Sequence, residues 1–166
     1  MTSLHRDDKP VARLAAVLRL KAKLLTGRVA TPRELRAMRE ALGGLLPAWL
    51  PPVLSRYKLI GTEFVLADDE DASGLGVEME WLEPAQIVSE MIEAQPGMAA
   101  SAGHYLEVGG CLLGSGDPYF IHCVGGDPAL VRVPHTAVTR TGALRTKSIE
   151  TVTRSLSSFL AKTNVS

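Results

Sequence analysis

Two thiols and a few imidazoles are the side chains of this sequence best suited to nucleophilic chemistry. The cysteines are Cys111 and Cys123, and His104 and His135 are histidines that could serve as bases. A nucleophile needs a base within hydrogen-bond reach, and the residue types alone single out no such pair. The sequence also lacks the Gly-x-Ser-x-Gly nucleophile elbow of many hydrolases. We therefore expect no catalytic residue, and a thiol-dependent hydrolase remains the alternative.

The spacing of these residues does not fit a metal site. His104, Cys111, His122 and Cys123 show neither the Cys-x-x-Cys nor the His-x-x-x-His spacing of zinc sites. His122 and Cys123 are neighbours on a predicted strand, so their side chains point to opposite faces. We expect buried structural cysteines, with no metal and no cofactor.

The segment Gly114–Pro118, Gly-Ser-Gly-Asp-Pro, invites comparison with a phosphate-binding loop. Such a loop leads into a helix, whereas Tyr-Phe-Ile-His-Cys-Val follows here and is typical of a strand. No lysine stands where a phosphate would need one. We predict a tight turn in which Gly116 has a backbone conformation unfavourable to other residues and Asp117 bonds to local backbone.

Acidic side chains are concentrated in residues 63–93, which contain no lysine or arginine. The four consecutive acids at positions 68–71 are more than a turn needs for its backbone hydrogen bonds. They also lack the alternating ligand spacing of a calcium-binding loop. They form either a solvated loop or a docking surface for a basic partner, because interface carboxylates steer cationic proteins. The candidate partner-binding residues are Asp68, Asp69, Glu70, Asp71, Glu78 and Glu80.

These residues must be positioned by helices and strands, and the first predicted element is a helix over residues 11–25. One face carries Val11, Leu14, Ala15, Leu18, Ala22 and Leu25. A second, smaller apolar strip is formed by Val17, Leu20 and Leu24. A single contact with the rest of the fold can bury only one of the two apolar strips. The other strip therefore favours a second contact, with a partner or with another copy of the chain.

Further helices are predicted by capping and periodicity. Thr31-Pro32-Arg33-Glu34 is a capping-box start, and Leu46-Pro47 opens a short helix whose first turn must hold Pro51 and Pro52. Pro84 begins another helix. A last helix is predicted from about Ser148, with Ile149, Val152, Leu156, Phe159 and Leu160 facing inward.

Strands are predicted where the apolar period changes to two. The candidates lie around residues 64–66 and 77–81 and at 105–113, 119–124 and 129–133. Short turns join the later strands, which implies antiparallel pairing. We predict an α+β fold with a mostly antiparallel sheet of about five strands and helices packed on one side. Residues 1–30 form an N-terminal helical extension, and residues 31–166 form the α+β domain.

Composition limits the classes of function. The 166 residues include 18 Lys plus Arg and 18 Asp plus Glu. A strongly basic domain is typical of nucleic-acid binding, so we expect no nucleic-acid partner. No apolar run approaches a membrane span, and the acidic start Met-Thr-Ser-Leu-His-Arg-Asp-Asp is not typical of a signal peptide. We expect a cytoplasmic protein without a membrane partner.

The order of elements and several motifs resemble the SUKH superfamily, which includes fungal cell-wall-synthesis regulators and bacterial immunity proteins against toxins. The resemblance covers roughly residues 34–161. It rests on the Leu46-Pro47 helix, the hairpin around Phe64-Val65-Leu66, the segment Tyr-Leu-Glu-Val-Gly-Gly-Cys-Leu-Leu-Gly-Ser-Gly-Asp-Pro-Tyr-Phe-Ile-His-Cys, and a closing helix ending in Ser158-Phe159-Leu160. The chain departs from the family pattern at Tyr57–Gly61, where an Asn-Gly pair is common, and in its extra helix at 11–25.

The resemblance implies a protein that is not an enzyme and that binds another protein. In an immunity role that partner is a toxin domain, which the protein would neutralise. The resemblance transfers no catalytic residue. The remaining alternative is a regulatory scaffold that forms a homodimer through residues 11–25.

Overall fold

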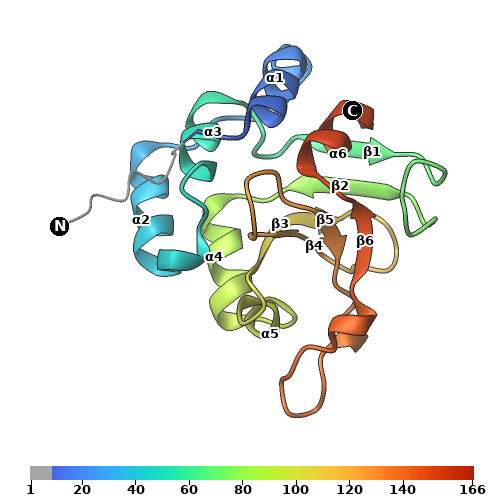
Figure 1. Ribbon diagram of the computed structural model, residues 1–166. Coiled ribbons are helices and arrows are strands. Elements are labelled where there is room, and N and C mark those ends of the chain that lie inside the picture. The colour runs from blue at the N-terminus through green and yellow to red at the C-terminus, as the bar shows by residue number, and fades with distance from the viewer. Residues whose placement is uncertain (1–8) are drawn as a thin grey trace.

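The strands and helices of this protein are described by a computed structural model that covers residues 9–166 (Figure 1). It is an α+β fold. Residues 1–8, the start of the predicted N-terminal extension, lie outside the described residues. Within residues 9–166, no helix is both long enough and apolar enough to cross a membrane.

The sheet has seven antiparallel strands in the order β6-β5-β4-β3-β2-β1-β7 and curls into a half-barrel (Figure 1). The strands are β1 (Glu63–Leu66), β2 (Val77–Trp81), β3 (Tyr105–Cys111), β4 (Tyr119–His122), β5 (Leu130–Arg132), β6 (Glu150–Thr153) and β7 (Asn164–Val165). The antiparallel pairing confirms the prediction from short turns. The expected number of about five strands was too low, because β6 and β7 were not predicted.

Six helices accompany the sheet: α1 (Ala12–Lys21), α2 (Pro32–Leu42), α3 (Leu50–Arg56), α4 (Pro84–Glu93), α5 (Gly97–Ser101) and α6 (Leu156–Lys162). They form two groups around the curled sheet. Helix α1 contacts α6 at one end, and α4 lies between α2 and α5 at the other, with α3 against α2 (Figure 1). Phe159 of α6 packs against Phe64 of β1, with ring centroids 5.8 Å apart.

The predicted helix starts follow the local chemistry. Thr31 accepts a hydrogen bond from the Glu34 amide while the Glu34 carboxylate accepts one from the Thr31 amide, as the capping box requires. Helix α3 begins at Leu50, later than Leu46-Pro47 suggested, and both Pro51 and Pro52 lie in its first turn. Proline is tolerated there because the first amides of a helix have no partner within it.

The predicted last helix was wrong in its first half. Residues from Glu150 to Thr153 form strand β6, and the helix begins at Leu156. Thr151, Val152 and Thr153 are β-branched and favour a strand. Ser155 then caps α6 by accepting a hydrogen bond from the Ser158 amide.

The N-terminal helix uses one of its two apolar strips within the fold. Leu14 and Leu18 of α1 are buried in the core. The helix ends at Lys21, and its side chain there donates to the Thr163 carbonyl at 2.6 Å. The predicted second strip is only partly present, because Val17 packs against the core and Leu24 lies beyond the end of the helix. Leu20 is 81% exposed and Leu24 is 55% exposed.

The glycine-rich segment between β3 and β4 is a turn between strands, as predicted. Gly116 has a φ of 65°, a region that side chains rarely adopt. The expected local role of Asp117 was wrong. Its Oδ1 accepts a hydrogen bond from the His135 amide at 3.1 Å, so it ties the turn to a loop elsewhere in the chain.

Candidate functional site

The acidic residues predicted from the sequence occupy two different environments. The loop between β1 and β2 carries the run from Asp68 to Asp71, and β2 itself carries Glu78 and Glu80. Asp68 and Asp69 are exposed. Glu70 is also accessible, but its carboxylate forms an ion pair with Lys162 of α6 at 2.5 Å.

Asp71 is a structural residue buried beneath the loop. It is 4% exposed, and its Oδ2 lies 3.3 Å from Nη2 of Arg132, which is 3% exposed. Its Oδ1 accepts a hydrogen bond from the Ser73 amide at 2.8 Å. The Asp71 side chain is therefore inaccessible to a partner, and we remove Asp71 from the candidate partner-binding residues.

Arg132 of β5 organises this part of the molecule. Its guanidinium donates to the Gly76 carbonyl at 2.7 Å, to Ser73 Oγ at 2.9 Å and to Glu150 Oε2 at 3.0 Å. It also lies over the Tyr119 ring, 5.1 Å from the centroid. One buried cation thus holds the second half of the acidic loop, from Asp71 to Gly76, to the sheet.

The sequence reasoning missed Arg132, although a signal was present. A single arginine stands in the otherwise apolar strand Leu-Val-Arg-Val. Arginine is rarely buried unless it is paired. Its position in such a strand therefore predicts a buried acidic partner, although it does not indicate which of the acids that partner is.

Glu78 and Glu80 share one face of β2, and the sheet register adds a third carboxylate. Glu63 of β1 stands directly opposite Glu80, and Val65 stands opposite Glu78. Leu112, which is exposed, donates its amide to the Glu78 carbonyl at 2.9 Å. We call Glu63, Glu78 and Glu80 the acidic face. Within residues 9–166, none of the three forms an ion pair.

The thiols are poorly placed for nucleophilic chemistry. Burial raises the pKa of Cys123 to about 12, so the thiolate is scarce near neutral pH. The Cys111 thiol lies 3.6 Å from both the Leu113 carbonyl and Ser115 Oγ. Within residues 9–166, no histidine ring is hydrogen bonded to either thiol, and no cluster of three or more His, Cys, Asp or Glu is arranged to hold a metal ion.

A hollow of about 470 Å³ brings Ser101 and His104 near the ends of α2 and α4. The Ser101 hydroxyl donates to the Met98 carbonyl at 2.8 Å and so does not face a base. A hydroxyl that is not activated by a neighbouring base is a weak nucleophile. This hollow therefore lacks the arrangement of a serine hydrolase.

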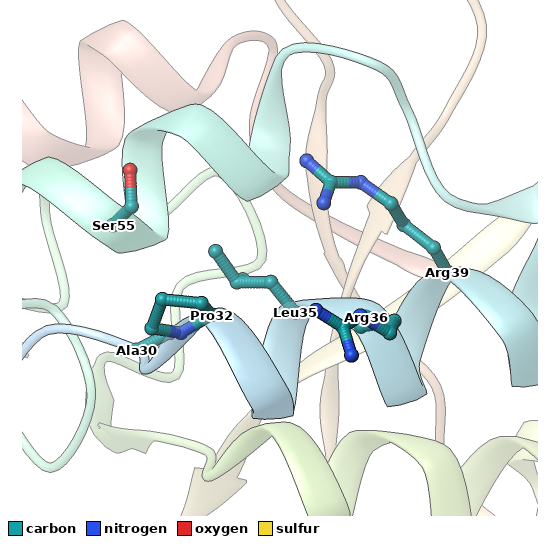
Figure 2. Close-up of a pocket in the computed structure, with 6 residues that line it drawn as sticks. All are labelled: Ala30, Pro32, Leu35, Arg36, Arg39 and Ser55. Carbon is teal, nitrogen blue, oxygen red and sulfur yellow. The ribbon is translucent and has the colours of Figure 1, made fainter.

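Two further hollows border α2 and α3. One hollow of about 420 Å³ is lined by Ala30, Pro32, Leu35, Arg36, Arg39 and Ser55 (Figure 2). A second hollow, of about 260 Å³, is lined by Arg39, Gly43, Leu46, Pro47, Ala48, Pro51 and Pro52. Arg39 borders both hollows, and we call their combination the α2–α3 groove.

Glu107 of β3 is a buried carboxyl group apart from these surfaces. It is 3% exposed, and its Oε2 has no hydrogen-bond partner within the described residues. Burial, and then the negative charge of Glu90, raise the pKa of Glu107 to about 8. At neutral pH this group is therefore mainly neutral.

No family model, no curated protein and no solved structure matches this chain. The resemblance to the SUKH superfamily accordingly remains a hypothesis that rests on the sequence motifs alone.

Proposed function

We propose that this protein is a binding module without catalytic activity, and that its acidic face binds a basic surface of another protein. The observation that carries the proposal is the pairing of Glu63 with Glu80. Like charges directly opposite each other on neighbouring strands are destabilising. A lysine or arginine from a partner would relieve that repulsion. Binding would thus supply the positive charge that Glu63 and Glu80 do not have beside them in the free protein.

The surroundings of the acidic face support a protein partner rather than a metal ion. Val65 and Leu112 contribute apolar area beside the carboxylates. Interfaces between proteins combine apolar contacts with charged groups that steer association. Asp68 and Asp69 extend the negative potential from the neighbouring loop.

An immunity role is the form of this proposal that the SUKH resemblance favours. Toxin domains that act on nucleic acids need a basic cleft to hold phosphates. An acidic face that occupies such a cleft would block access of the nucleic acid. The partner class we propose is therefore a toxin domain with a basic active-site cleft.

Affinity capture with variant baits tests the proposal. The wild-type protein, E63Q/E80Q and the control E40Q/E93Q would each be immobilised and exposed to extract of the native cell. Glu40 and Glu93 are exposed glutamates on helices, so the control matches the charge change. We expect a protein with a basic surface to be retained by the wild type and the control but lost from E63Q/E80Q.

Kinetics with the captured partner provide the second measurement. Because exposed charges are screened beyond about 10 Å at 0.1 M salt, the association rate should fall steeply as salt is added. E63Q/E80Q should show a lower rate and a weaker dependence on salt. An association rate that is indifferent to both changes would exclude the acidic face as the binding surface.

Self-association is a second candidate function, and the solvent-facing strip of α1 favours it. Leu20 near the end of α1 and Leu24 in the turn that follows it are both exposed. Burying two leucines against another copy would gain about 1.5–3 kcal/mol for each side chain. A scaffold of this kind would use residues 11–25, as the sequence predicted.

A further inference from the structure

The α2–α3 groove is a positively charged surface that the proposed function does not use. Arg36 and Arg39 lie one turn apart on α2, and both are exposed. In Figure 2, the Arg39 side chain reaches from α2 toward α3, and Leu35 lies between the two helices. Within residues 9–166, neither guanidinium forms an ion pair.

The other charges on α2 are already engaged or lie elsewhere. Arg28 forms an ion pair with Glu34 at 2.7 Å and another with Glu83. Arg33 borders a different hollow, between α2 and α4. Of the three arginines of α2, Arg36 and Arg39 therefore line the groove, while Glu40, an exposed acid of the same helix, lines neither hollow.

The lining of the groove combines these cations with apolar side chains. Leu35 contributes to the first hollow, and Leu46 and Pro51 contribute to the second. The Ser55 hydroxyl donates to the Pro52 carbonyl at 2.8 Å, so that donor is already engaged. The lining of the groove thus combines two guanidinium groups with apolar side chains.

We propose that the α2–α3 groove binds an acidic peptide segment in which Glu or Asp alternates with apolar residues. Guanidinium groups bind carboxylates through paired hydrogen bonds. Side chains three residues apart on a helix are about 5–6 Å apart, and alternate side chains of an extended peptide are about 6.5 Å apart. Two carboxylates of such a peptide therefore match Arg36 and Arg39.

The shape and composition of the groove favour a peptide over other anions. A free phosphate would occupy one guanidinium and leave the apolar lining unused. Single-stranded nucleic acid needs aromatic side chains for base stacking, and none lines either hollow. The two hollows, which both border Arg39, instead suit a linear chain with both charged and apolar side chains.

Fluorescence anisotropy with a defined probe tests this assignment. The probe is a labelled peptide of about eight residues that alternates Glu with Leu and Ala and is about 26 Å long when extended. We expect saturable binding to the wild type and a loss of affinity of about tenfold or more in R36Q/R39Q. The control R33Q/R56Q changes the net charge equally, with one substitution on α2 and one on α3 outside the groove lining, and should keep the wild-type affinity.

Competition and stability measurements decide against the alternatives. A peptide with Lys in place of Glu should not compete, and neither should inorganic phosphate or a single-stranded oligonucleotide. Equal weakening by R33Q/R56Q, effective competition by the oligonucleotide, or no saturable binding would overturn the proposal. So would a lower melting temperature of R36Q/R39Q, since it would indicate a structural role for the arginines.

A second copy of the chain is the remaining occupant that the experiment can reveal. If the wild type self-associates in sedimentation and R36Q/R39Q does not, the groove binds a second copy and the peptide assignment is wrong. The acidic face is unchanged in R36Q/R39Q. A negative result for the α2–α3 groove therefore does not contradict the proposed binding through the acidic face.

Discussion

At the scale of single residues, Arg132 does most to define the region around the proposed binding surface. Five groups converge on its guanidinium: Asp71, Ser73, Gly76, Tyr119 and Glu150. A buried ion pair of this kind is costly to break, because removal of one partner leaves the other charge buried without compensation. The acidic loop therefore depends on a residue that is more than fifty positions away in the chain.

Replacing Arg132 with methionine should destabilise the protein strongly. We expect a loss of about 3–5 kcal/mol in the free energy of unfolding, since Asp71 would be left unpaired. The double variant D71N/R132M should recover part of that loss. Denaturant unfolding measures both, and additive effects of R132M and D71N would contradict the proposed coupling.

Glu107 should make stability depend on pH in a defined direction. Its pKa is raised from 4.5 to about 8 on folding, so the folded protein holds this proton over a range where the unfolded chain has lost it. Stability should therefore fall as pH rises from about 4.5 to 8 and then level off. At about 1.4 kcal/mol per pKa unit, the total loss is at most about 5 kcal/mol.

The variant E107Q provides the comparison for this prediction. Its amide cannot ionise, so its free energy of unfolding should change less with pH than that of the wild type. Unfolding curves at pH 5, 6, 7 and 8 would measure the difference. Parallel pH profiles for the two proteins would show that Glu107 does not titrate as described.

At the scale of elements, α1 is attached through one face and has an exposed strip formed by Leu20 and, just beyond its end, Leu24. Leu14 and Leu18 join the core, and Arg13 donates to Ser158 of α6 at 3.1 Å. The exposed strip contributes nothing to these contacts. Polar replacements there should consequently leave folding intact and affect only association with another molecule.

The variant L20S/L24S tests the strip directly. If the strip mediates self-association, sedimentation should show the wild type as a dimer and the variant as a monomer, with unchanged melting of the monomer. L75S is a control, since Leu75 is also exposed but lies in the loop between β1 and β2. Identical sedimentation of all three proteins would exclude this role for α1.

Local signals were sufficient to predict several elements but not all of them. The capping box at Thr31 and the alternation in β2 are encoded by neighbouring residues, and both are present. The spacing of Val152 and Leu156 fits one face of a helix, yet they lie in a strand and a helix respectively. Pairing of β6 with β5 decided between these alternatives, and that pairing is not a local property.

At the scale of the whole molecule, the proposed cationic groove and the acidic face lie on different elements. Arg36 and Arg39 line the α2–α3 groove, and the acidic face lies on β1 and β2. The uneven distribution along the chain predicted part of this separation. Which acids remain free could not be predicted, because the pairing of Asp71 with Arg132 and of Glu70 with Lys162 depends on tertiary contacts.

The pairing of β1 with β7 also bears on how the protein folds during synthesis. Phe64 pairs with Val165, about a hundred residues later, so one edge of β1 stays open until that segment has emerged. Open strand edges template aggregation, and charged side chains are a common protection against it. The negative charges of Glu63 and Glu80, whose mutual repulsion is unfavourable in the finished fold, would also repel the same strands of another nascent chain.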